Sequence, residues 1–225
     1  MNTVSGLRPY HSIYSVIMAF SVENAISKTV EYFDKNDFSL PLLATLMAFI
    51  FTVVAFYHGT ISYWEKNYGQ RTGSNEELVQ SDFYIAMIHA VLFVAAANYI
   101  LLPQKFAKLF VLLLLVDIFA IFVLRILTKK LSPEHHPQST AKLLAWIKIN
   151  AFALGAVILA RILINGGAEL SSLKNGLNSA QSLDLWTAES RWYYTFIGIV
   201  VFRFLFDVIV SHRIELRSRR GEVKI

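Results

Sequence analysis

The longest apolar segments of this chain are about 20 residues long, and this length constrains the fold more than any other feature. A helix of about 20 residues crosses the hydrocarbon core of a bilayer. Five such segments are clearly apolar. A sixth segment, 12–33, has a similar length but is more polar, since it contains Glu23, Asn24 and several serines. The sequence therefore predicts an all-α, polytopic membrane protein with six transmembrane helices. The five clearly apolar segments span residues 40–62, 82–102, 107–128, 141–165 and 191–212.

The composition supports a membrane protein rather than a soluble enzyme. Charged residues make up 16 % of the chain, well below the roughly 25 % of a soluble domain. Cysteine is absent, which excludes disulfides and thiolate chemistry. The six histidines lack metal-ligand spacing, and no nucleotide-binding or hydrolase motif is present. We therefore expect a single domain over residues 1–225 that is not an enzyme and has no cofactor or metal.

Lysine and arginine are distributed unevenly between the predicted loops. With six spans, eleven of these residues fall on the side that carries both termini, against five on the other side. Because basic loops stay in the cytoplasm, we expect both termini to be cytoplasmic, in the inner (plasma) membrane. The basic tail, 213–225, is expected to contact lipid headgroups or a soluble partner rather than nucleic acid. Its expected contact residues are Arg213, Arg217, Arg219 and Arg220.

Asp117 interrupts the segment "VLLLLVDIFAIFVLRILT" near its centre. A charge at this depth costs several kcal/mol unless it finds a partner, a proton or water. Depth along the predicted helices places Asp117 near Lys148, Arg203 and Asp207, so we expect these four to form one buried network. Arg161 lies in the outer half, where Glu23 is the nearest acid. Two interpretations stay open: ion pairs that fix helix packing, or groups that act in gating or ion passage.

The first predicted helix carries a stripe of small and acidic residues at steps of three and four. Three arrangements suit it. The stripe packs within the same chain with Glu23 paired to Arg161, or it lines a water-filled pore between subunits, or the helix lies flat on the membrane. Its opposite face holds Tyr14, Ile17, Met18 and Ala25, with Ser21 among them. The residues of this stripe, named the α1 stripe below, are Ser12, Ser15, Ala19, Glu23, Ser27 and Glu31.

A ring of carboxylates from several subunits favours cations. We therefore expect an oligomeric channel or pore for small cations, whose partners are the bilayer and further copies of the chain. Two alternatives stay open. One is a non-conducting subunit that anchors or signals to a soluble cytoplasmic partner through the basic tail. The other is a small ion-coupled transporter that uses the intramembrane charges.

Overall fold

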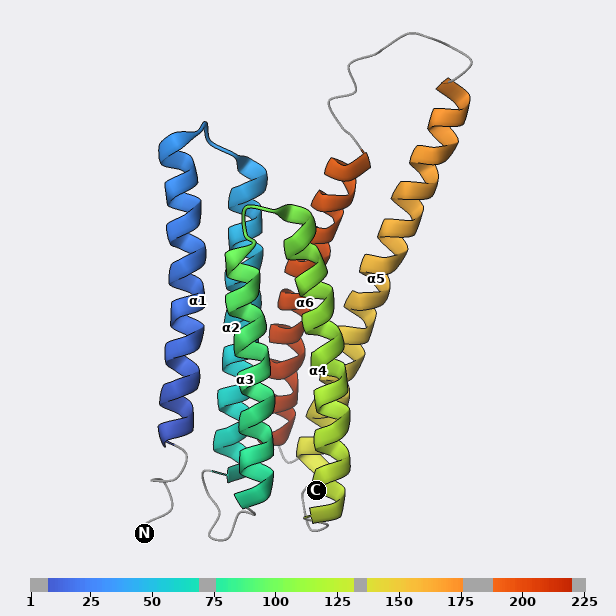
Figure 1. The fold of residues 1–225 in the computed structure, drawn as a ribbon. Coiled ribbons are helices and arrows are strands. Elements are labelled where there is room, and N and C mark those ends of the chain that lie inside the picture. The colour runs from blue at the N-terminus through green and yellow to red at the C-terminus, as the bar shows by residue number, and fades with distance from the viewer. Residues whose placement is uncertain (1–7, 69–75, 132–136, 176–187, 220–225) are drawn as a thin grey trace.

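The computed structural model describes residues 8–68, 76–131, 137–175 and 188–219, and these residues form six α-helices joined by short connections (Figure 1). The predicted all-α fold is confirmed. The helices are α1 (Arg8–Lys35), α2 (Leu40–Tyr68), α3 (Glu76–Asn98), α4 (Pro103–Leu131), α5 (Pro137–Asn175) and α6 (Ala188–Arg219).

Local chemistry explains several helix ends. Pro103 and Pro137 open α4 and α5, where a missing backbone N–H costs nothing. At the start of α2, the Ser39 hydroxyl accepts a hydrogen bond from the backbone N–H of Leu42 at 3.4 Å. α3 ends at Asn98 rather than at residue 102, because a turn over residues 99–101 precedes Pro103. A residue before proline disfavours helical backbone, so α3 cannot run directly into α4.

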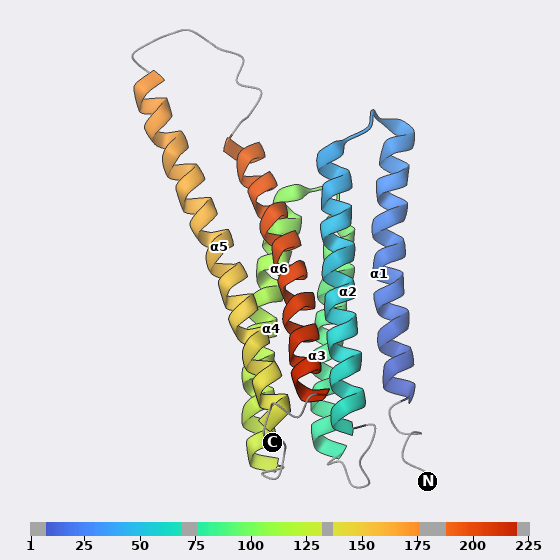
Figure 2. The same ribbon diagram turned by 180° about the vertical axis from the view of Figure 1, so that it is seen from behind.

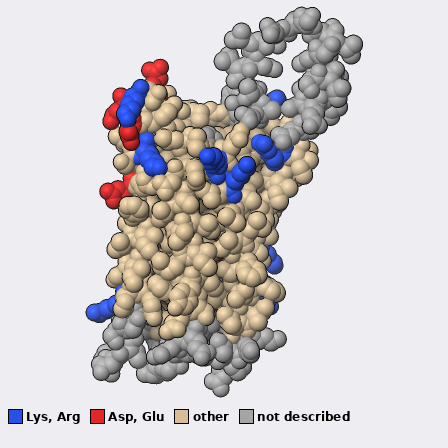
Figure 3. Space-filling model, in the orientation of Figure 1, with Lys and Arg blue, Asp and Glu red and all other residues tan. Residues whose placement is uncertain are grey.

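Five of the described helices are long and apolar enough to cross a membrane. The chain is therefore a multi-pass membrane protein. On the face shown in Figure 3, Lys and Arg lie toward the two ends and Asp and Glu toward the upper end, and the band between the ends is almost free of charge. α1 is the more polar helix, but it runs alongside α2 and α3 rather than across their ends (Figures 1 and 2). The apolar spans are Leu40–Glu65, Val79–Asn98, Gln104–Leu127, Leu143–Ile164 and Arg191–Val210.

The helices form a flattened ring with two layers. α3 and α4 lie on one face, and α2 and α6 lie behind them (Figures 1 and 2). α1 closes one edge against α2 and α3, and α5 closes the other edge against α4 and α6. Because successive helices alternate in direction, α1 begins and α6 ends at the same end of the bundle. This arrangement places the midpoints of α3, α4, α5 and α6 around one interior.

Aromatic and small side chains fill that interior. The buried ring of Phe196 on α6 packs edge-on against Phe110 of α4, at 5.3 Å between centroids. Phe93 of α3 makes similar contacts with Phe49 and Phe56 of α2. At the α1–α3 contact the fully buried side chains include Ala25 and Ala90. Small residues let two helices approach closely, which holds α1 on the bundle without a large apolar face.

Candidate functional site

The carboxylate of Asp117 on α4 lies at the centre of the bundle, where its side chain is 15 % exposed. Its two oxygens contact two different helices. Oδ1 lies 3.4 Å from Nε2 of His89 on α3, and Oδ2 accepts a hydrogen bond from the side-chain amide of Asn150 on α5. Asp117 therefore joins three helices near their midpoints.

Asn150 connects this carboxylate to a buried cation. Its Oδ1 accepts a hydrogen bond from Nε of Arg203 on α6 at 2.8 Å, while its Nδ2 donates to Asp117. The carboxylate requires a donor and the guanidinium requires an acceptor, so these neighbours fix the orientation of the amide. We call the four residues His89, Asp117, Asn150 and Arg203 the central polar cluster. The helices α3, α4, α5 and α6 each contribute one residue to it.

Arg203 is 6 % exposed, yet only part of its hydrogen-bonding capacity is used. The guanidinium carbon lies 4.8 Å from the centre of the Phe56 ring, a cation–π contact from α2. Within the described part of the chain, Nη1 of Arg203 has no hydrogen-bond partner. Asp207, one turn further along α6, and Asp117 are the carboxylates whose charges act on this guanidinium. A buried donor without a partner is costly, so this N–H is available to a further hydrogen-bond acceptor.

His89 is 5 % exposed, and its ring makes a hydrogen bond with the backbone of Ile85. Since Nε2 has no hydrogen bond among the described residues, the nitrogen that bonds to Ile85 is Nδ1. Nδ1 then donates to a backbone carbonyl one turn earlier in α3, and neutral His89 presents the Nε2 lone pair to Asp117. Two lone pairs repel at 3.4 Å. A proton on either group would turn this contact into a hydrogen bond.

A cavity of about 40 Å³ borders the cluster. That volume holds a few water molecules. Its polar wall is formed by Thr60, Asp117, Asn150, Arg203 and Asp207. Its apolar wall comes from α2 and α5, including Phe56 and Trp146. Gly59 shapes this wall, because a Cβ added there would lie 3.3 Å from the Trp146 ring.

The predicted network of intramembrane charges differs from the observed cluster at two positions. Lys148 is exposed, because it lies about 200° around α5 from the inward-facing Asn150. Arg161 stacks on Trp192, with 4.7 Å between the guanidinium carbon and the ring centre. Asp207 borders the cavity beside the cluster, and its charge acts on Arg203. Asp117 and Arg203 do meet, through Asn150.

His89 and Asn150 were not predicted as partners of Asp117, because the expected network contained only formally charged residues and the only function considered for the histidines was metal binding. The signal available was their position, since both are polar residues inside apolar spans. A buried amide or imidazole in a membrane segment needs a partner for the same reason that a charge does. Once Asp117 faces inward, residues of this kind on neighbouring helices are its natural partners.

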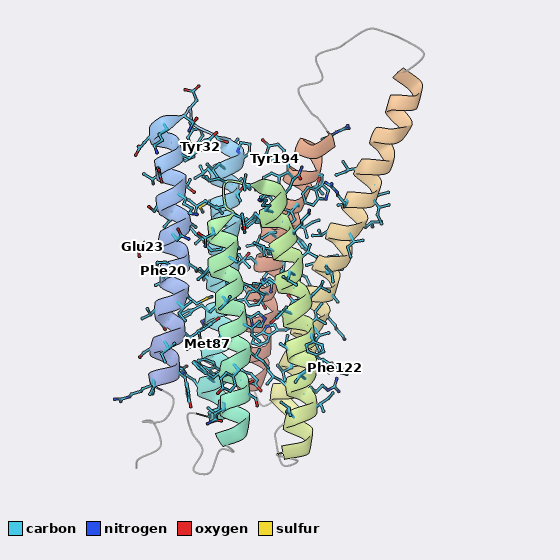
Figure 4. All side chains as sticks on the ribbon, viewed as in Figure 1. Phe20, Glu23, Tyr32, Met87, Phe122 and Tyr194 are labelled. Atoms are coloured by element: carbon cyan, nitrogen blue, oxygen red, sulfur yellow. The ribbon has the colours of Figure 1, made fainter. Side chains whose placement is uncertain are left out.

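The α1 stripe faces away from the bundle. Ser15 is half-buried, where its hydroxyl lies 2.9 Å from that of Tyr57, and Glu31 pairs with Lys35 on the same helix at 2.7 Å. Glu23 is exposed and points away from the other helices (Figure 4). The remaining members are exposed as well: Ser12, Ala19 and Ser27.

The opposite side of α1 packs on the bundle through Tyr14, Met18 and Ala25. Two of the three arrangements considered for the stripe therefore do not match the structure. Apart from Ser15, which contacts Tyr57, the stripe does not pack within the described part of the chain. Glu23 cannot pair with Arg161, because α1 and α5 close opposite edges of the ring. α1 also does not lie flat across the ends of the other helices. The side chains of Arg213, Arg217, Arg219 and Arg220 lie outside the described part of the structure.

Among the described residues, no group of three His, Asp or Glu side chains is arranged to hold a metal ion. Comparison of the chain with protein families, curated proteins and solved structures finds no match. The central polar cluster and its cavity are therefore the features from which a function can be inferred.

Proposed function

We propose that this protein is a small ion-coupled transporter whose coupling ion is a proton held between His89 and Asp117. The observation that supports it is the central polar cluster, buried near mid-membrane beside a cavity large enough for water. Ionisable groups at this depth are costly, and they mark ion pathways and proton relays in membrane proteins. Coupling-ion sites of transporters lie near the midplane for the same reason.

The proton site follows from the two unequal contacts of Asp117. Asn150 stabilises one oxygen of the carboxylate, whereas His89 offers a lone pair to the other. The site is therefore complete only with one additional proton. The other titratable groups that act on Asp117 are Arg203 on α6 and Tyr14 on α1. Arg203 favours the ionised carboxylate, so the proton is held reversibly rather than permanently.

The cavity gives this proton a way in and out. A proton moves between a buried group and bulk water only along hydrogen-bonded water or side chains. The cavity borders Asp117 directly and extends along Thr60 on α2 and Asp207 on α6. Both residues lie further toward the end of the bundle where α1 begins. We infer that the site opens to that end, which the distribution of basic residues assigns to the cytoplasm.

Proton movement tests this proposal directly. We expect wild-type protein in liposomes to dissipate an imposed pH gradient, followed with an enclosed pH-sensitive dye. Asp117→Asn keeps the shape and the hydrogen-bond capacity toward Asn150 but removes the titratable group. It should reduce the rate by about tenfold or more, since general acid–base groups contribute at least that much to proton transfer.

The matched control is Asn24→Asp, which adds a carboxylate on the α1 side of the bundle, away from the cluster. It should leave the rate unchanged. His89→Gln keeps the polarity at Nε2 but cannot relay a proton, and it should resemble Asp117→Asn. A wild-type protein that moves no protons in either direction, or an Asp117→Asn variant as fast as wild type, would exclude the proton site.

A second candidate function is the oligomeric, cation-selective pore predicted from the sequence. The observation that favours it is the outward-facing α1 stripe, which puts Glu23 on the surface of the bundle. A carboxylate facing lipid is costly. Contact between α1 helices of several copies would place Glu23 in water, with Ser27 beside it. The pore requires a symmetric oligomer in mild detergent, and a monomer would exclude it.

A further inference from the structure

The cavity beside Arg203 combines an unsatisfied cation with an apolar wall. Arg203 is nine-tenths buried, and its Nη1 has no hydrogen-bond partner among the described residues. The rings of Phe56 and Trp146 line the same cavity. A ligand that matches both walls has a negatively charged oxygen at one end and a short apolar group at the other. We propose that the cavity binds a small monocarboxylate through Arg203, and that this anion is carried together with the proton.

The chemistry of Arg203 selects an anion. Its Nε already donates to Asn150, which helps to hold the guanidinium in place, while Nη1 has no partner among the described residues. A carboxylate accepts such a donor in a charge-assisted hydrogen bond, which is stronger than a bond to water. A guanidinium keeps its positive charge at any physiological pH, so Arg203 repels a cation that is as small as the carboxylate ligand.

The size of the cavity selects a short ligand. The cavity has a volume of about 40 Å³, so it can hold a carboxylate with one or two further carbons in place of a few water molecules. Gly59 and the Trp146 ring bound this space closely, because a Cβ added at residue 59 would lie 3.3 Å from the ring. A longer chain would have to displace that ring from its contact with α2.

The acidic residues around the cavity explain why the anion would travel with a proton. Without the shared proton, Asp117 and Asp207 outweigh the single charge of Arg203, and the cavity is negative. With one proton between His89 and Asp117, the charges cancel. The anion then enters a neutral cavity instead of a negative one. This difference matters because repulsion between like charges is strong in a low-dielectric interior. This coupling rests on the proposed proton site, whereas the anion site rests on Arg203 alone.

Binding is tested by calorimetric titration of the detergent-solubilised protein with sodium propionate at constant ionic strength. We expect saturable binding at one site per chain, and none with propylammonium chloride, a cation of similar size. Arg203→Gln should weaken propionate binding by about tenfold or more. Arg161→Gln removes a different membrane-embedded guanidinium, which stacks on Trp192 and does not border the cavity, and it should change the affinity by less than about twofold.

A variant with the charges intact provides independent evidence. Ala55 lines the cavity, and Ala55→Leu fills the apolar side while leaving Arg203 in place. It should also abolish binding, so the test does not depend on the folding of Arg203→Gln. Equal affinities for wild type, Arg203→Gln and Ala55→Leu, or no saturable binding to wild type, would show that the cavity holds water only and would overturn the proposal.

The anion site and the proton site can fail separately. In weakly buffered solution, wild type should take up protons as propionate binds, and Asp117→Asn should bind propionate without this uptake. Propionate binding with no proton uptake in wild type would keep the anion site and remove the proton coupling. Proton movement in liposomes without propionate binding would keep the proton site and remove the proposed substrate.

Discussion

At the scale of single residues, Asn150 determines how the buried charges are organised. It is 1 % exposed and lies between a carboxylate and a guanidinium, using both ends of its amide. Without it, Asp117 and Arg203 would either separate or make a direct ion pair. A direct pair would use donors of Arg203, whose Nη1 now has no partner among the described residues. The amide therefore keeps the two charges in one cluster, while Arg203 retains a donor for a further hydrogen bond.

We predict that Asn150→Leu destabilises the folded protein strongly. The change leaves a buried carboxylate oxygen and a buried guanidinium N–H without partners, and each such loss costs about 1–3 kcal/mol. The melting temperature in detergent should fall by several degrees. Asn24→Leu is the matched control, because Asn24 makes a single exposed hydrogen bond to Asn98 at 3.2 Å. Equal melting temperatures for the two variants would show that the amide bridge does not stabilise the fold.

A double-mutant cycle measures the coupling across this bridge. Removing one charge of a buried pair leaves the other uncompensated, whereas removing both together costs less. Asp117→Asn and Arg203→Leu should therefore each lower the melting temperature, and the double variant should recover part of the loss. Effects that simply add would show that the two charges are energetically independent.

At the scale of helices, α1 has two faces with different roles. The face with Tyr14, Met18 and Ala25 is buried against α2 and α3. Near one end of α1, Lys28 donates to the backbone carbonyl of Asn98 at 3.2 Å and so satisfies a terminal carbonyl of α3. The other face, the α1 stripe, contributes little to the packing of the chain. The stripe therefore contacts lipid, water or another copy of the chain, and its composition reflects that contact.

Two alanines on α1 separate these roles. Ala25 is 0 % exposed at the helix contact, so Ala25→Leu should overpack it and cost about 1–3 kcal/mol of stability. Ala19 is exposed, so Ala19→Leu should leave the melting temperature unchanged. If the stripe lines a pore between copies, Ala19→Leu should still block cation flux through liposomes, and Glu23→Gln should reduce selectivity for cations. A cation flux that neither substitution changes would exclude the pore.

At the scale of the whole molecule, the alternating directions of the helices determine the topology. The connection between α1 and α2 lies at the opposite end of the bundle from the start of α1 (Figure 1). If α1 crosses the membrane with the other five helices, cysteines introduced at Arg8 and Asn36 should react with an impermeant thiol reagent from opposite sides. We expect Arg8→Cys to be reached from the cytoplasm. Because the chain has no native cysteine, the thiol reagent can label only the introduced residue.

Labelling of both positions from the same side would show that α1 does not cross. α1 would then have to leave the bundle, and the contact of Lys28 with Asn98 would be lost. A third cysteine at Asp37, next to Asn36, should repeat its result and controls for local accessibility. The same preparations give the oligomeric state, since a symmetric assembly and a monomer differ in mass.

The sequence by itself determined the all-helical fold and the apolar membrane segments. These properties depend on the length and composition of local segments, because a bilayer requires every backbone group to be satisfied within its own helix. Helical periodicity also placed Tyr14, Met18 and Ala25 together on one face of α1, but it did not determine which face of α1 is buried. The importance of Asp117 was evident from one carboxylate in an apolar run.

Only the tertiary structure decided which polar residues meet. Depth along a helix can be read from the sequence, but the angle at which each helix turns toward the interior depends on its neighbours. Rotation of α5 places Asn150 inside and Lys148 outside, although both lie at similar depth. The ring order of the helices likewise brings His89 to Asp117 and keeps Arg161 far from Glu23. The partners of a buried charge are set by packing between helices, which no single segment of the sequence records.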